Sequence, residues 1–200
     1  MQSMKLKSRI RIAKYRSYKG QVGRVADNVL QRQFEANKPN QKWVTDVTEF
    51  NIRGEKLYLS PIMDLFNGEI IAFKTQRRPQ FGLVRDMLND AMEKLEPNDK
   101  PIVHSDQGWQ YQMRHYQQCL AYKGLTQSMS RKGNCLDNAS MESFFGILKS
   151  ECFHGEEFNS VDELEQTVKE YIHYYNHERI KVKLKGLSPV DYRTQSLKAS

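Results

Sequence analysis

The strongest constraint on the fold is a set of three β-forming runs that follow one another closely between residues 43 and 73. They span residues 43–50, 57–63 and 69–73. A turn at residues 53–56 separates the first two, and Asn67-Gly68, a strong hairpin signal, precedes the third. Strands joined by such short turns run antiparallel, so the sequence predicts a three-stranded antiparallel meander.

Helical and β-type patterns then alternate along the chain. Apolar residues from Val84 to Leu95 recur at the spacing of one helix face, and a short apolar strand follows at 102–104. The other predicted elements are a helix at 112–122, a strand at 125–130, a helix at 137–152 and a helix from Ser160 to Tyr175. Strands reached through helices can lie parallel to their neighbours. We therefore expect an α/β fold with a mixed five-stranded sheet, three strands antiparallel and two reached through helices, flanked by helices.

Positive charge is concentrated at the N-terminal end. The chain has a net charge of +7, and residues 1–24 contain eight basic residues and no acidic one. Such an arm is typical of a contact with nucleic-acid phosphates, although a solvated leader has the same charge pattern. We expect three regions: a basic arm and linker (1–40), a folded core (41–178) and a basic C-terminal tail (179–200).

The sequence also excludes several protein classes. No apolar run approaches the roughly 18 residues of a membrane-spanning helix, and the charged first 24 residues lack the apolar centre of a signal peptide. We therefore expect a cytoplasmic protein that is not bound to a membrane. The three cysteines (Cys119, Cys135 and Cys152) are odd in number and lack C-x-x-C spacing, so we expect reduced, packed thiols rather than disulfides or a zinc site.

Three carboxylates occupy positions where a purely solvated charge is not expected. Asp46 lies inside an apolar β run, Asp106 follows the strand at 102–104, and Glu142 has bulky apolar neighbours. A carboxylate on a half-buried element needs a partner, and carboxylates that converge repel one another unless a cation lies between them. Oxygen ligands suit Mg²⁺ or Mn²⁺. Helix geometry alone leaves Glu142 open to a solvated role, because charged residues often flank an apolar stripe.

Basic and amide side chains near Glu142 are candidates for contacts with a phosphate backbone. Asn138 and Lys149 lie four residues before and seven after Glu142, on the same edge of the predicted helix. Arg131 and Lys132 begin a polar loop, 131–136, that we expect to be mobile and to touch phosphates. A solvated Lys149 remains the alternative.

A second basic run precedes Gly186. Arg179, Lys181, Lys183 and Lys185 alternate with other residues there. This alternation favours an extended segment that faces DNA, with a solvated edge as the alternative.

Three other features have simpler explanations. His173 and His177 are four residues apart on the last predicted helix, but no Cys pair or H-E-x-x-H pattern accompanies them, so a polar helix face is favoured over a metal site. Asp64 lies just before the Asn67-Gly68 turn, and turn chemistry explains it better than catalysis. Trp109 could stack on a base, but packing is favoured.

The order and spacing of these motifs resemble a known family. Asp106 and Glu142 are separated by 35 residues. The chain resembles the catalytic half of OrfB-type transposases of bacterial insertion sequences, which share the retroviral-integrase core. The matching segments are 43–48, 104–108, 137–145, 174–176 with Arg179, and 186–192. The resemblance covers roughly residues 5–195, and four motifs in this order are highly specific.

The resemblance implies an RNase H-like fold and an integrase-type catalytic core at 41–178. It makes Asp46, Asp106 and Glu142 the D, D and E of a catalytic triad that binds Mg²⁺ or Mn²⁺, with two ions expected when DNA is bound. Lys149 matches the basic residue seven positions after the Glu. The implied activity is metal-dependent DNA cleavage and strand transfer at element ends.

The resemblance also implies partners. These are the terminal repeats of the element, target DNA, further copies of the chain in the active complex, and an upstream DNA-recognition frame; a nucleoid-associated location follows. Full-length relatives have more chain upstream, so we expect a truncated or separately started catalytic portion. Two alternatives stay open: an RNase H-like nuclease that only hydrolyses, and a domesticated, non-catalytic DNA-binding derivative.

Overall fold

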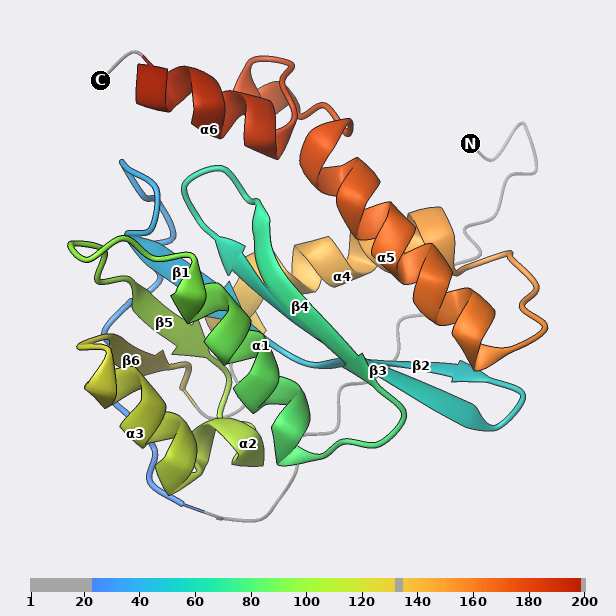
Figure 1. Cartoon of the computed structure of the whole chain (residues 1–200), viewed down its shortest axis with the longest axis horizontal. Helices are drawn as coiled ribbons and strands as arrows, with labels where there is room; N and C mark the ends of the chain where they lie inside the picture. Colours follow the sequence, from blue (N-terminus) through green and yellow to red (C-terminus); the bar gives the residue numbers. More distant parts are fainter. Residues whose placement is uncertain (1–22, 132–134, 199–200) are drawn as a thin grey trace.

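The computed structural model describes residues 23–131 and 135–198. Its strands are β1 (Lys42–Thr45), β2 (Thr48–Ile52), β3 (Glu55–Asp64), β4 (Ile70–Gln76), β5 (Ile102–Ser105) and β6 (Thr126–Met129). Its α-helices are α1 (Phe81–Glu93), α2 (Trp109–Gln112), α3 (Arg114–Tyr122), α4 (Ala139–Cys152), α5 (Val161–His177) and α6 (Pro189–Lys198). Short 3₁₀ helices span Cys135–Asn138 and Val182–Leu184 (Figure 1).

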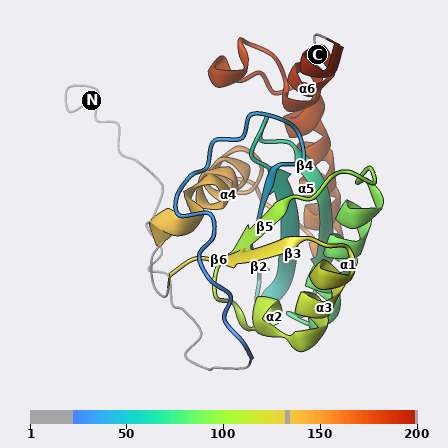
Figure 2. The same cartoon turned by 90° about the vertical axis from the view of Figure 1, so that its left-hand side faces the viewer.

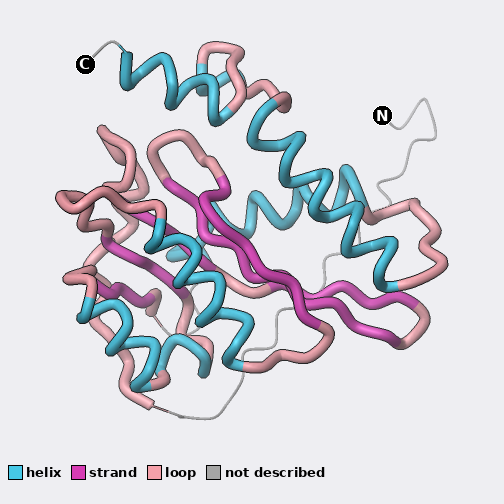
Figure 3. The backbone as a smooth tube through the Cα atoms, in the orientation of Figure 1, coloured by secondary structure: helices cyan, strands magenta, loops and turns pink. Residues whose placement is uncertain are grey.

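The strands form one mixed sheet, shown as the magenta segments of Figure 3. Tyr58 of β3 pairs with Glu49 of β2 on one side and with Gln76 of β4 on the other, and both pairings are antiparallel. β1 pairs antiparallel with β3 and parallel with β5, and β5 pairs parallel with β6. The predicted mixed sheet is confirmed, with its two helix-connected strands parallel to β1.

The predicted strand at 43–50 is interrupted at Asp46 and Val47, so it forms two strands. The pairing with β3 keeps one register across the gap, since Thr45 opposes Ile62 and Thr48 opposes Leu59. This register places Pro61, which has no N–H to donate to the ladder, opposite Asp46. β1 and β2 therefore count as one interrupted strand of the predicted five-stranded sheet, and the interruption is at the first candidate carboxylate.

Helices cover both faces of this sheet, as the edge-on view of Figure 2 shows. Alternation along β1 assigns each residue to one face: the side chain of Trp43 packs with α1 and α3, and Val44 packs with α4 and α5. Both side chains are fully buried. Two apolar cores therefore hold the ends of β1 and β5 in place.

Helix boundaries follow the sequence with one break. The predicted helix at 112–122 corresponds to α3, and Met113, whose ψ of 135° is extended, separates it from α2, which was not predicted. The N-cap of α5 is confirmed, because the Ser160 hydroxyl accepts a hydrogen bond from the Glu163 N–H at 3.1 Å. No helix among the described residues is both long and apolar enough to cross a membrane. Cys119 and Cys152 are free thiols, as expected; the Cys135 side chain lies outside the described part.

The N-terminal segment is more firmly attached than an arm and linker would be. Residues 1–22 lie outside the described residues, but residues 26–30 run along β6 (Figure 2). The Met129 N–H donates to the Asp27 carbonyl at 3.2 Å, and Leu30 is only 2% exposed. Residues 26–30 therefore pack onto the edge of the sheet within the region expected to be an arm and linker, with Leu30 as the buried anchor.

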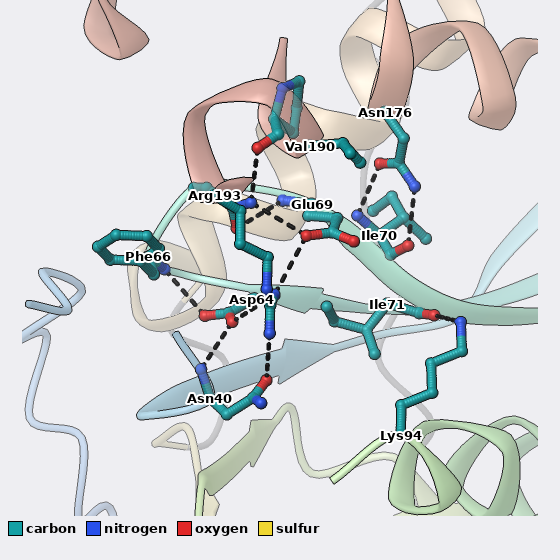
Figure 4. A network of polar contacts seen from close by, with 12 residues as sticks. Asn40, Asp64, Phe66, Glu69, Ile70, Ile71, Lys94, Asn176, Val190 and Arg193 are labelled. Atoms are coloured by element: carbon teal, nitrogen blue, oxygen red, sulfur yellow. Dashed lines mark hydrogen bonds and ion pairs between the residues drawn. The ribbon is translucent and has the colours of Figure 1, made fainter. Parts of the chain in front are cut away.

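The C-terminal residues are also not a free tail, because α6 is tied to the turn between β3 and β4 (Figure 4). Arg193 of α6 donates to the Asp64 carboxylate at 3.2 Å and to the Glu69 carboxylate at 3.1 Å. Asp64 also accepts from the N–H groups of Asn40 at 2.8 Å and Phe66 at 3.0 Å. The bond to Phe66 confirms the predicted turn role of Asp64, and the buried ion pair with Arg193 was not predicted.

Candidate active site

Asp46 and Asp106 lie at the same edge of the sheet. Asp46 directly follows β1 and Asp106 directly follows β5. These strands are parallel neighbours, with Val44 opposite His104. Since the carboxyl ends of parallel strands meet at one edge, the topology brings together two residues that are 60 positions apart.

Backbone N–H groups orient both carboxylates. Asp46 Oδ1 accepts a hydrogen bond from the Val47 N–H at 2.7 Å, and Asp106 Oδ1 accepts one from the Gly108 N–H at 2.8 Å. A Cβ atom added at Gly108 would lie 2.9 Å from Asp106 Oδ1 and 2.6 Å from the Gln110 side-chain nitrogen. The absence of a side chain at Gly108 is therefore what lets the Asp106 carboxylate fold back onto the loop.

The family resemblance implies that Asp106 takes part in metal-dependent DNA cleavage, so we expect Gly108→Ala, which displaces this carboxylate, to lower the cleavage rate by about 10- to 100-fold. Stability should change little, since the φ of −57° at Gly108 suits alanine. The measurement is single-turnover cleavage of an oligonucleotide with Mg²⁺. Gly82→Ala is the matched control, because its added Cβ would meet no atom closer than 3.6 Å. Equal rates for both variants would contradict this role of Gly108.

Glu142 belongs to α4, a helix that packs on one face of the sheet. It lies in the first turn of α4, on the exposed side of the helix, while Met141 and Phe145 face the core. Asn138, which precedes the helix, donates from its side-chain amide to the Thr45 carbonyl at 3.3 Å. This bond holds the start of α4 beside the residue that precedes Asp46.

The charges of Asp106 and Glu142 act on Asp46. Burial, then the charge of Asp106 and, more weakly, that of Glu142 raise the pKa of Asp46 well above its usual value. The buried Tyr111 phenol has its pKa raised by burial and by the charges of the same Asp46 and Asp106. A cluster of like charges in a half-buried place is stabilised by a cation.

The donor atoms fit a hard divalent metal ion. All are carboxylate oxygens, the ligands that Mg²⁺ and Mn²⁺ prefer. Among the described residues, no three His, Cys, Asp or Glu side chains already lie close enough together to enclose an ion. The strand ends bring Asp46 and Asp106 together, while Glu142 is on the exposed side of α4.

Two of the predicted DNA contacts near the site have structural partners instead. Asn138 is 4% exposed and bonds to Thr45, so a direct contact between its side chain and DNA is not supported. Arg131 is 60% exposed at its side chain, but its guanidinium is bound to the Asp137 carboxylate at 3.0 Å. Lys132, with most of the predicted mobile loop, lies outside the described residues.

Lys149 is also engaged within the fold. Its Nζ donates to the Glu49 carbonyl at 3.0 Å and lies 5.3 Å from the centre of the Phe50 ring. Partial burial lowers the pKa of Lys149. The solvated alternative is wrong, because this ammonium bridges α4 and β2; a DNA contact would use its remaining N–H donors.

The predicted DNA-facing run at 179–185 is not extended. Arg179 binds the Glu151 carboxylate on α4, with N–O distances of 2.6 to 3.2 Å. Lys181 Nζ donates to the Tyr175 hydroxyl at 2.7 Å, and burial lowers its pKa to about 8. These two residues therefore fasten the end of α5. Lys183 and Lys185 are exposed, in a tight turn where Lys185 has a φ of 58°.

The histidine pair and Trp109 have different surroundings. His173 and His177 lie on the exposed side of α5, with ring centroids 4.4 Å apart, and no third ligand of the described residues joins them. Trp109 is half-buried and lines a cavity of about 110 Å³ with Val47 and Leu83. The favoured polar-face and packing interpretations agree with these positions.

Comparison with known proteins identifies the family. Two models of the integrase core domain match the chain, one over residues 36–135 and the other over residues 142–197, and together they include all three carboxylates. The putative transposase InsK for insertion sequence element IS150 of Escherichia coli K12 is 57% identical over 196 residues, 98% of this chain and 69% of that protein. The chain belongs to the integrase-core transposases of bacterial insertion sequences.

Other relatives of this transposase agree. A transposase-like protein of Haemophilus influenzae is 60% identical over 197 residues, 98% of this chain and 91% of that protein. Transposase InsF for insertion sequence IS3fB of Escherichia coli K12 is 39% identical over 182 residues, 90% of this chain and 63% of that protein. The chain is thus the catalytic core of a DDE-type polynucleotidyl transferase that acts on DNA in the transposition of insertion sequences.

Solved structures confirm the fold. The HTLV-2 integrase catalytic core domain in complex with magnesium superposes with a TM-score of 0.60 at 16% sequence identity, covering 78% of this chain and 98% of that chain. A chain of the simian T-cell lymphotropic virus intasome gives 0.61 at 17% identity, covering 80% and 54%. The predicted RNase H-like integrase fold is therefore confirmed.

Proposed function

We propose that Asp46, Asp106 and Glu142 are the catalytic residues of this transposase. The observation that carries the proposal is the meeting of Asp46 and Asp106 at the ends of two parallel strands, with Glu142 near enough for its charge to affect Asp46. No covalent link between enzyme and DNA is required, so no Ser or Tyr nucleophile is assigned. The attacking group is water for strand nicking and a DNA 3′-OH for strand transfer.

The metal proposed for this site is Mg²⁺ or Mn²⁺, with two ions when DNA is bound. Bound there, such ions would activate the attacking oxygen and stabilise the leaving one. Asp46, Asp106 and Glu142 would supply the carboxylate oxygens that hold these ions, with Asp46 as the ligand common to both. Because Glu142 is exposed, its side chain is free to turn toward the pair. The magnesium in the HTLV-2 integrase core supports this assignment by analogy.

The substrate is proposed to be the ends of the insertion sequence, followed by target DNA. The exposed side chains of Lys183 and Lys185 can bind DNA phosphates. Lys149, on the same helix as Glu142, has N–H donors beyond the one that binds the Glu49 carbonyl. The structural similarity to a chain of an intasome supports a complex of several copies of this transposase. The last proposed partner is a protein from an upstream reading frame that recognises DNA. The test is a gel assay with Mg²⁺: cleaved and joined products support the proposal, and cleavage without joining contradicts it.

Residues 1–22 are proposed to contact DNA by charge. They contain seven basic residues, which equals the net charge of the whole chain. Deleting them should lower DNA affinity and make the dependence of log affinity on log salt shallower by several units, about 0.9 for each phosphate that the arm no longer neutralises. The deletion spares Arg24, whose backbone N–H is bonded to the Gln112 carbonyl. An unchanged salt slope would show that these residues are a solvated leader.

A further inference from the structure

The start of α4 is fixed by a buried carboxylate that the proposed chemistry does not use. Asp137, five residues before Glu142, has a side chain only 1% exposed. It accepts hydrogen bonds from Asn28 Nδ2 at 3.2 Å, Arg32 Nε at 2.7 Å and Arg131, the last through its backbone N–H and through two guanidinium nitrogens at 3.0 to 3.1 Å. We call these four residues the Asp137 cluster. It joins the N-terminal segment, the end of β6 and the approach to α4.

The charges in the Asp137 cluster are strongly coupled. Hydrogen bonds from Arg131 and Arg32 hold the pKa of Asp137 far below its usual range, so the carboxylate is ionised at any physiological pH. The side chains of Arg32 and Arg131 are 44% and 60% exposed, so packing alone does not fix them. The buried carboxylate is thus the fixed point, and the two guanidinium groups converge on it.

The backbone of Asp137 makes a second connection, to β5. His104 Nε2 lies 2.8 Å from the Asp137 carbonyl oxygen, and Nδ1 lies 2.8 Å from Ser128 Oγ. A carbonyl can only accept, so Nε2 bears the proton and Nδ1 accepts from the Ser128 hydroxyl. Ser128 Oγ in turn accepts from the Leu30 N–H at 3.1 Å. Every polar atom of the buried His104 ring is therefore paired within this chain of bonds.

The anchors of α4 lie beside the three proposed catalytic residues. Asn138 binds the carbonyl of Thr45, which precedes Asp46. His104, two residues before Asp106, binds the carbonyl of Asp137. Any shift of the helix start would change the position of Glu142 relative to both aspartates.

We propose that Asp137 is a positioning residue: with Arg32 and Arg131 it clamps the start of α4 onto the ends of β1 and β5, and so sets where Glu142 stands relative to Asp46 and Asp106. This inference rests on the proposed role of Glu142. Residues 28–32 take part in this clamp, because Asn28 and Arg32 both bind the Asp137 carboxylate. Charge-assisted bonds to a buried carboxylate are strong and directional, which suits such a clamp.

The test is Asp137→Asn, which keeps the shape of the side chain and removes its charge. We expect the single-turnover cleavage rate at saturating DNA and Mg²⁺ to fall more than 10-fold, with DNA affinity within about 2-fold of wild type. Amide hydrogen exchange in residues 139–145 should become at least 10-fold faster, while exchange in α1 stays unchanged. Arg32→Met should move both readouts in the same direction by less, and Arg32→Lys should retain more function because it keeps the charge. If Asp137→Asn does not fold, the comparison of Arg32→Met with Arg32→Lys still tests the proposal.

The control on the same helix is Glu151→Gln, which weakens a more exposed carboxylate–arginine pair, with Arg179, at the other end of α4. Its cleavage rate should equal that of wild type. Unchanged exchange in residues 139–145 of Asp137→Asn would overturn the proposal, and so would faster exchange with a wild-type cleavage rate. A loss of DNA affinity that matches the loss in rate would also overturn it. Glu142→Gln, tested in parallel, examines the catalytic role separately: a loss of rate in that variant alone would reject only the clamp.

Discussion

Asp46→Asn, Asp106→Asn and Glu142→Gln should each reduce Mg²⁺-dependent DNA cleavage and joining by at least about 10³-fold. Each removes an anionic oxygen ligand, and metal ligation is worth several kcal/mol of transition-state stabilisation, which corresponds to a rate loss of this size. The fold should survive, because removing one of several like charges that repel one another does not weaken packing. Single-turnover assays and circular dichroism measure the two effects.

Asp86→Asn is the control for these three variants. Asp86 is a half-exposed aspartate on α1 whose ion pair with Arg85 involves only its neighbour in the chain. It should cleave at the wild-type rate. If any one of the three carboxylate variants keeps near-full Mg²⁺-dependent activity, the assignment of that residue is wrong.

The largest expected effect on stability is that of Asp64→Asn. Asp64 is fully buried, and its partner Arg193 is 19% exposed, so the change removes the more deeply buried of the two carboxylates that bind this guanidinium and leaves it with Glu69 alone. Removing one member of a buried ion pair costs about 3–5 kcal/mol of unfolding free energy. Loss of the pair should also loosen α6, since Arg193 is the residue that ties this helix to Asn40, Asp64 and Glu69 (Figure 4).

Urea unfolding measures this effect, and Asp162→Asn provides the comparison. Asp162 pairs with Arg77 at 2.5 Å, but both side chains are at least half exposed, so this ion pair should contribute nothing measurable. Below the unfolding transition, Asp64→Asn should still cleave DNA, because Asp64 is not one of the proposed catalytic residues. Similar unfolding curves for the two variants would contradict the structural role given to Asp64.

The sheet and the acidic residues were predictable because their signals are local. Period-2 and helical patterns determine which side chains face the two cores, and they are visible in the sequence from Trp43 onward. Asp46 was expected inside the strand at 43–50, so its meeting with Asp106 was implied by the family resemblance and not by the end of a predicted strand. The break between β1 and β2 was less evident, because it depends on Pro61, which stands opposite Asp46 on another strand.

The basic residues were predicted less well, for a physical reason. The sequence shows the charge of a lysine or arginine but not its partner, and the partners of Arg179 and Lys149 are 28 and 100 residues away. The same holds for Asp137, which stands out in the sequence only as part of a motif. Its role in the structure depends on Arg32, which is 105 residues earlier. Tertiary contacts of this range leave no periodic signal.

Anomalous diffraction from crystals soaked in Mn²⁺ would test the central claim most directly, since it locates the metal without reference to activity. The account predicts a peak between the carboxylates of Asp46 and Asp106, with the Glu142 side chain turned toward the site when DNA is present. In crystals of Asp46→Asn that peak should be lost. A fully occupied Mn²⁺ site elsewhere on the described chain, with none at Asp46 and Asp106, would contradict the account.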